Sequence, residues 1–196
     1  WRLNTEIIYR TRSQIALLQK VESAICDRGY YIACWYTRRM PIILKSGREK
    51  SLLRRHPWIF SGAVHHVDEE PASGGTVDLL SFNGDFLACA AYSPISQIRA
   101  RVWTFTNEPV DAAFFRRKIH AAITQRSTLN LQHATDSFRL IHAESDGIPG
   151  LIVDRYGDVL VLQALTTGSE FWKETLADIL LEETGLSIIY ERSDVD

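Results

Sequence analysis

The chain has 196 residues, 45% hydrophobic and 23% charged, which is the balance of an ordinary soluble protein with one large or two small domains. No apolar run is long enough for a membrane-spanning helix or the core of a signal peptide. The three cysteines, Cys26, Cys34 and Cys89, are odd in number and form no CxxC pair, which argues against a disulfide framework or a zinc site. We therefore expect a cytoplasmic protein without membrane or metal partners.

The net charge of −2 hides an asymmetry along the chain. Residues 1–39 carry a net charge of +4 and residues 40–130 a net charge of +3, whereas residues 131–196 carry −9. Opposite signs in two parts of a chain suggest a basic part that binds a partner and an acidic part with another role. The alternative for the acidic part is a plain solvated surface.

Residues 1–39 lack the regular pattern of the rest. The chain begins at Trp1, its only methionine is Met40, and clear strand and helix patterns start just after Met40. We interpret residues 1–39 as an N-terminal extension and expect the natural chain to begin at Met40. The alternative is a real helix packed on the following domain, formed by four apolar residues at helical spacing, Ile15, Leu18, Val21 and Ile25.

The next stretch predicts a small, mostly β unit with one short helix. The helix is expected over residues 49–55 and ends before Pro57. Asn83-Gly84 is typical of a type I′ hairpin turn, and Cys89 reads as a small buried strand residue. Strands are expected at residues 42–44, 59–60, 63–67, 76–82, 85–92 and 97–105.

A second α+β unit follows. Asp111 can cap a helix that runs to about Leu129. We interpret Asp146-Gly147 as turn residues rather than catalytic ones. Strands are expected at residues 138–143, 151–154, 159–165 and 187–190.

The last helix of this unit has start and stop signals. Thr167 and Glu170 form a potential capping box, and the helix is expected to run to about Glu183, where Gly185 ends it. Its expected buried stripe consists of Trp172, Leu176, Ile179 and Leu180.

A dense basic run is the first candidate for function. Clustered cations can follow a phosphate backbone, and adjoining rings can stack on bases. The alternative is a solvated helix face. The run lies within eleven residues, is opposed only by Glu49 and is followed by an aromatic residue: Lys45, Arg48, Lys50, Arg54, Arg55 and then Trp58.

The strand over residues 98–105 adds a second basic surface. Period-two alternation places Arg99, Arg101, Trp103 and Phe105 on one face, an arrangement suited to RNA. In the alternative, the two aromatic residues pack beneath the following helix and the arginines are merely solvated.

The sequence lacks the common signatures of catalysis. No two glycines are separated by one residue, so no GxGxxG loop exists for a nucleotide or S-adenosylmethionine. The six histidines do not pair with acids at metal-ligand spacing, and no nucleophile elbow occurs. We predict no catalytic, cofactor-binding or metal-binding residue in this chain.

Several long blocks resemble one enzyme family. They are Lys45–Ala63, Ala91–Pro94 with Gln97–Phe105, Glu144–Leu151, Asp154–Gly157 and Arg192–Val195. In order and content they resemble the bacterial 23S rRNA cytosine-5 methyltransferases of the rRNA large subunit methyltransferase I type. The resemblance covers residues 40–195.

The resemblance implies an α+β fold class: a PUA-like small β-barrel over residues 40–107, then a central α+β domain over 108–191. Residues 192–196 would begin a linker to a Rossmann-like methyltransferase domain that this chain lacks. That domain would bind S-adenosylmethionine and carry the cysteine that attacks carbon 6 of cytosine. The chain alone is therefore expected to bind ribosomal RNA without catalysis. The predicted RNA-binding residues are Lys45, Arg48, Lys50, Arg54, Arg55, Trp58, Arg99 and Arg101.

Two other functions fit the sequence. One is a free-standing RNA-binding adaptor of the PUA type without catalysis. The other is a protein-interaction module whose acidic part binds a basic partner.

Overall fold

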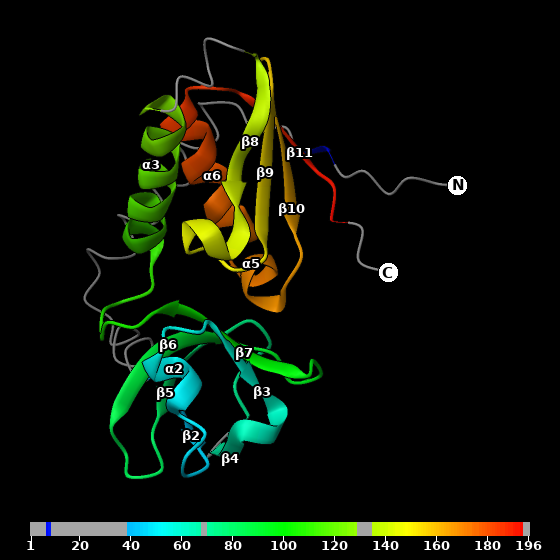
Figure 1. Cartoon of the computed structure of the whole chain (residues 1–196). Helices are drawn as coiled ribbons and strands as arrows, with labels where there is room; N and C mark the ends of the chain where they lie inside the picture. Colours follow the sequence, from blue (N-terminus) through cyan, green and yellow to red (C-terminus); the bar gives the residue numbers. More distant parts are fainter. Residues whose placement is uncertain (1–6, 9–38, 68–69, 129–134, 194–196) are drawn as a thin grey trace, which may run out of the picture.

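The computed structural model describes residues 7–8, 39–67, 70–128 and 135–193, which form two stacked units (Figure 1). The first unit is a six-stranded sheet with the order β3-β7-β6-β5-β2-β4 and one short helix, α2 (Lys50–Leu53). Only β2 and β5 pair in parallel; the other neighbours are antiparallel. The strands are β2 (Pro41–Leu44), β3 (Trp58–Phe60), β4 (Val64–Val67), β5 (Thr76–Leu80), β6 (Phe86–Tyr92) and β7 (Ile98–Thr104).

The second unit has a five-stranded sheet with the order β1-β11-β10-β9-β8. Its helices α3 (Ala112–Thr128) and α6 (Lys173–Thr184) lie side by side on one face of the sheet (Figure 1). The short helix α5 (Thr167–Phe171) lies at the end that meets the first unit. The strands are β1 (Ile7–Ile8), β8 (Ser137–His142), β9 (Leu151–Tyr156), β10 (Val159–Ala164) and β11 (Ile188–Glu191).

Each unit has its own apolar core. The first core lies inside the curved sheet and includes Ile42, Leu44, Leu79 and Val102. The second core lies between the sheet and the helices, and it also takes in Ala91 and Trp103 from strands of the first unit. The second core therefore extends across the boundary and joins the two units.

Several expected elements are confirmed. The Asp111 carboxylate accepts a hydrogen bond from the Phe114 backbone N–H (2.8 Å) and so caps α3. Gly185 ends α6 in the left-handed conformation, with φ of 70°. Cys89 is fully buried in β6, as expected of a small strand residue. Gly147, also left-handed, follows the 3₁₀ turn η2 (Ala143–Asp146), in keeping with a turn at Asp146-Gly147.

The expectation of a type I′ turn at Asn83-Gly84 is wrong. Asn83 does not have a positive φ, so Asn83-Gly84 is not a type I′ turn; only Gly84 is left-handed, at φ of 91°. The Ser81 side chain shapes this loop instead, since its oxygen accepts hydrogen bonds from the Asn83 and Asp85 backbone N–H groups. Five residues therefore join β5 to β6 rather than two.

The capping box lies one residue earlier than predicted. Thr166 is the N-cap, and its hydroxyl and that of Ser169 bond to each other's backbone N–H groups. The helix is also split at Trp172 into α5 and α6. Trp172 still packs on the second core, beside the buried Leu176, so the predicted stripe is largely retained.

The expected N-terminal extension mostly lies outside the described residues, as do its amphipathic stretch, Cys26 and Cys34. Two parts are described. Ile7 and Ile8 form β1, which pairs antiparallel with Tyr190 and Ile189 of β11. Arg39 forms an ion pair with Asp78 of β5 (3.0 Å), so it lies against the first unit.

An ion cluster joins α3 and α6 and predicts a pH effect. The pKa of Glu183 is lowered, first by a hydrogen bond from the His120 ring to its carboxylate (2.9 Å) and then by Arg116 (3.1 Å). A lowered carboxyl pKa stabilises the fold at pH values above the ordinary pKa, and this stability is lost as the pH falls through the lowered value.

In Glu183→Gln we expect a lower thermal unfolding midpoint at pH 7 and a smaller decrease of that midpoint between pH 6 and pH 3. Thermal unfolding across this range tests it, with the exposed Glu70→Gln as control; equal pH slopes in the wild type and Glu183→Gln would contradict it.

Candidate nucleic-acid interface

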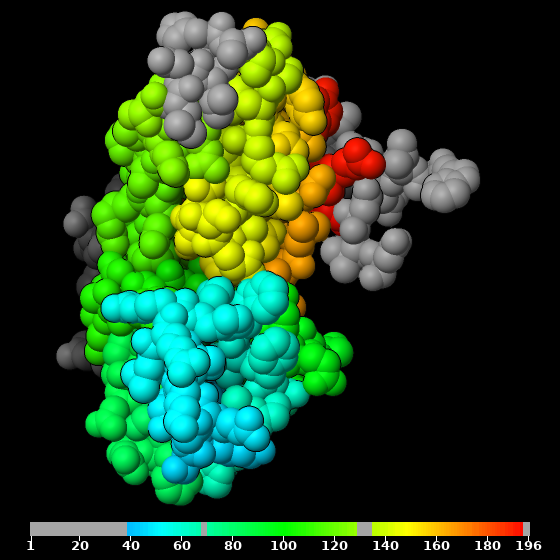
Figure 2. Space-filling model, viewed as in Figure 1, coloured from blue at the N-terminus to red at the C-terminus, as the bar shows by residue number. Residues whose placement is uncertain are grey.

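Five of the eight predicted RNA-binding residues lie on one exposed surface. They surround α2, which forms part of the front of the first unit in Figure 2. We call this surface the cationic face: Lys45, Arg48, Lys50, Arg54 and Arg55, all of them exposed.

Local structure explains why these side chains point outward. The buried Leu52 anchors α2 in the first core, so the rest of this short helix projects into solvent. Arg48, Lys50 and Arg54 form no ion pair with any residue that the structure describes. Arg55 has a positive φ of 63° and its guanidinium lies 4.8 Å from the centre of the Phe105 ring. These cations are thus available to an anionic partner.

Trp58 and Arg101 lie elsewhere, between the two units. They are register partners on β3 and β7, and the Arg101 guanidinium lies 5.2 Å from the Trp58 ring. Glu144, in η2 of the second unit, accepts hydrogen bonds on one oxygen from the Trp58 indole N–H (2.8 Å) and from Arg101 (3.1 Å). These three partly buried residues therefore join the units, and we call them the seam triad.

Arg99 supports a loop of the first unit. Its guanidinium donates hydrogen bonds to the backbone carbonyls of Ser93 (3.1 Å) and Pro94, which lie in the loop between β6 and β7. The contacts hold this loop against β7. The structure thus brings together five of the predicted residues. It places Trp58 and Arg101 in contact with the second unit and Arg99 in contact with a loop of the first unit.

The predicted alternation along β7 is confirmed as far as Trp103. Ala100 and Val102 face the first core, whereas Trp103 faces the second unit, where its ring packs edge-on against Phe115 of α3 (5.2 Å between centres). Phe105 departs from the pattern and packs on the first core. Trp103 therefore lies beneath the following helix, as in the alternative raised by the sequence.

A close contact between α5 and the first unit completes the boundary. The Thr167 hydroxyl donates a hydrogen bond to the Tyr92 carbonyl oxygen (3.1 Å). A Cβ atom at Gly168 would lie 2.4 Å from the Ala91 Cβ and 2.8 Å from Cζ2 of Trp103. Glycine is thus required at this point, because the backbone of α5 lies directly on β6 and β7.

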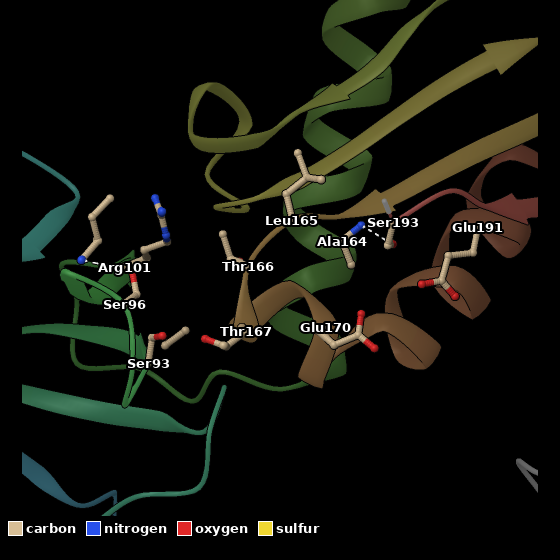
Figure 3. A pocket seen from close by; sticks show the side chains of 13 residues that line it. Ser93, Ser96, Arg101, Ala164, Leu165, Thr166, Thr167, Glu170, Glu191 and Ser193 are labelled. Atoms are coloured by element: carbon tan, nitrogen blue, oxygen red, sulfur yellow. Dashed lines mark hydrogen bonds between the residues drawn. The ribbon is translucent and has the colours of Figure 1, made fainter. Parts of the chain in front are cut away.

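A pocket lies between this contact and the seam triad (Figure 3). Its volume is about 450 Å³. The first unit contributes Ala91, Ser93, Ser96, Ile98 and Arg101, and the second unit contributes residues 164–168, Glu170, Glu191 and Ser193. We call it the seam pocket.

A separate ionisable cluster surrounds Cys89. Burial raises the pKa of the Cys89 thiol to about 11, and burial also raises the pKa of Asp78 against the opposing effect of Arg39. Arg39 donates hydrogen bonds to the Glu108 carbonyl (2.8 Å) and the Asn107 side chain (2.7 Å). The raised pKa favours the protonated thiol near neutral pH, as is typical of a buried structural cysteine.

Within the ranges that the structure describes, no three His, Cys, Asp or Glu residues are placed to hold a metal ion. None of the helices there is both long and apolar enough to cross a membrane.

Sequence reasoning missed two carboxylates that matter here. The sequence indicates a turn at Asp146 and no role for Glu144, yet Glu144 belongs to the seam triad and Asp146 pairs with Arg126 through both oxygens (2.7 Å each). The only available signal was their position in one of the blocks shared with the resembling family.

Comparison with known proteins supports the sequence resemblance. A model of a PUA-like domain matches residues 42–105, which are the first unit. Proteins named ribosomal RNA large subunit methyltransferase I match most of the chain. That of Citrobacter koseri is 50% identical over 155 residues, 79% of this chain and 39% of the relative. That of Shewanella amazonensis is 49% identical over 156 residues, with the same coverage.

Solved structures show the same fold. A protein from Streptococcus mutans described as a SAM-dependent methyltransferase aligns with a TM-score of 0.67 at 17% identity, over 79% of this chain and 40% of its own. A methyltransferase solved in complex with SAH aligns with a TM-score of 0.68 at 17% identity, with the same coverage. The expected α+β class is thus confirmed.

The match to curated relatives is strong but covers only part of their length. The chain spans about two fifths of the relatives it matches. It carries a PUA-like domain and is about 50% identical, over 79% of its length, to the ribosomal RNA large subunit methyltransferase I proteins.

Proposed function

We propose that this chain is the RNA-binding portion of an S-adenosylmethionine-dependent methyltransferase that modifies cytosine at carbon 5 in ribosomal RNA. The observation that carries the proposal is the cationic face of the PUA-like domain, within a chain about 50% identical to ribosomal RNA methyltransferases. The target nucleotide class comes from the family resemblance described above.

The cationic face suits RNA for a physical reason. Each cation that contacts a phosphate releases a condensed counterion, so binding is favoured at low salt and weakens steeply as salt rises. The net charge of −9 over residues 131–196 would repel RNA, so the phosphate contacts are expected on the first unit alone.

The methyl transfer itself is assigned to residues outside this chain. No glycine-rich cofactor loop occurs in the sequence. We propose that S-adenosylmethionine supplies the methyl group in the whole protein, as the names of similar structures suggest. The part played by this chain is to bind the RNA and orient it through the contact between its two units.

The proposal predicts that two cations flanking α2, Arg48 and Arg54, control RNA affinity. In Arg48→Ala/Arg54→Ala, binding to a ribosomal RNA hairpin should weaken about tenfold, and the slope of log affinity against log salt should fall by about two, one for each lost phosphate contact. Fluorescence polarisation at several salt concentrations measures both quantities. Both side chains are exposed, so the fold should be unaffected.

A matched control separates local contact from overall charge. Arg117→Ala/Arg139→Ala also removes two cations, but from the second unit. It should leave affinity and salt slope near the wild-type values. Equal losses in the two double variants would show that binding depends on net charge and not on the cationic face.

A further inference from the structure

The seam pocket is adjacent to the residues predicted to bind RNA, and none of the similarities described above gives it a role. We infer that it binds the base of one unpaired nucleotide of the bound RNA. The inference rests on the proposed RNA-binding function and adds a second subsite to it. Its volume of about 450 Å³ lies in the range of small-molecule sites, which are commonly about 300–1,000 Å³.

The apolar part of the pocket wall suits the flat faces of a base. Its walls include the apolar side chains of Ala91, Ile98, Ala164 and Leu165. Bases that are unstacked from a helix bind by stacking on side chains and by hydrogen bonds at their edges. Two hydroxyl groups are placed for such bonds: Ser96 and Ser193 each accept a hydrogen bond from a backbone N–H, which leaves the hydroxyl proton to donate.

One end of the pocket is acidic. Figure 3 shows Glu170 and Glu191 at the end opposite Arg101, with Thr166 and Thr167 between them. Lys173 contacts the Oε1 atom of both carboxylates (2.7 and 2.8 Å), and the Oε2 atoms can still accept hydrogen bonds. Two carboxylates with one lysine repel a phosphate, but they suit the amino group of cytosine, adenine or guanine.

The other end is suited to the sugar-phosphate backbone. Arg101 lines the pocket there, and its guanidinium is held in place by Trp58 and Glu144. Arg99 supports the neighbouring loop that carries Ser93 and Ser96. A nucleotide can thus enter with its base toward the carboxylates and its phosphate at the Arg101 end.

A pair of RNA duplexes tests the inference with the whole chain. One is blunt and fully paired, and the other has the same sequence with a single bulged cytosine. We expect the chain to bind the bulged duplex about tenfold more tightly, the effect of one stacked base. Leu165→Trp should fill the pocket and remove this difference without weakening binding to the blunt duplex.

Ile95→Trp is the matched control. Ile95 is 91% exposed in the loop beside the pocket and does not line it, so the added indole should leave the preference for the bulge intact. A bulged uridine, which lacks an exocyclic amino group, should bind less tightly than the bulged cytosine. Equal binding of the bulged and blunt duplexes by the wild type overturns the inference. A preference for the bulge that survives Leu165→Trp also overturns it, and this is the result expected if the pocket held a peptide instead. Failure to bind either duplex would instead overturn the proposed RNA-binding function.

Discussion

Replacing Arg126 with alanine is expected to destabilise the protein by about 3–5 kcal/mol, the usual cost of removing one partner of a buried ion pair. Arg126 donates to both oxygens of Asp146 at 2.7 Å, and the two side chains are only 12% and 3% exposed. Without Arg126, the carboxylate would keep only the His142 backbone N–H (2.6 Å) as a hydrogen-bond partner among the described residues. Urea unfolding of the wild type and the variant measures the difference.

Arg139→Ala is the matched control because it removes a similar two-point contact. Arg139 donates to both oxygens of Asp154 at 2.8 and 3.0 Å, but its side chain is 44% exposed. Exposed pairs contribute about 0–1 kcal/mol, so this variant should unfold close to the wild type. If the two variants lose equal stability, burial does not determine the strength of the Arg126 pair. Adding Asp146→Ala to Arg126→Ala should recover part of the loss, since no unpaired charge is then buried.

The same pair supports the contact between the two units. Asp146 ends η2, and Glu144 of the seam triad lies two residues before it. Loss of Arg126 should therefore loosen Glu144 and its contacts with Trp58 and Arg101. The PUA-like unit would then be held less firmly against the second unit.

Much of the fold could be predicted because local chemistry determines it. Alternation along residues 98–103 assigned the two faces of β7, and Asp111 and Gly185 marked two helix ends. The errors arose where neighbouring residues compete for one role. Thr166 and Thr167 can both cap a helix, and the sequence does not show that Ser169 completes the box with Thr166.

The candidate site was harder to predict because it depends on distant contacts. The basic run is visible in the sequence, and its exposure follows from one buried residue, Leu52. Arg101 looked equally available, yet it is paired with Glu144, 43 residues away. No repeating pattern in the sequence indicates a contact between residues so far apart, so the seam triad and the seam pocket could not be predicted from the sequence.

Gly168→Ala is expected to destabilise the protein by about 1–3 kcal/mol, as overpacking of a closely packed contact does. Alanine favours a helix over glycine by about 1 kcal/mol, so local propensity alone predicts the opposite sign. The new methyl group would lie 2.4 Å from the Ala91 Cβ and 2.8 Å from Trp103, and α5 would have to move away from the first unit. Thermal unfolding measures the effect, and a lowered midpoint is the expected result.

Two further variants show whether the contact between the units is the cause. Gly62→Ala has no atom within 4 Å of the new Cβ and should leave the midpoint nearly unchanged. Ala91→Gly removes the atom that Gly168→Ala would strike, so the double variant should be more stable than the sum of the two single effects, as coupled neighbours are. Additive losses would mean that the Gly168 effect does not arise from the contact with Ala91. A positive coupling would instead show that glycine at this position sets how closely the PUA-like unit packs on the second unit. It would thereby set the shape of the seam pocket that lies beside it.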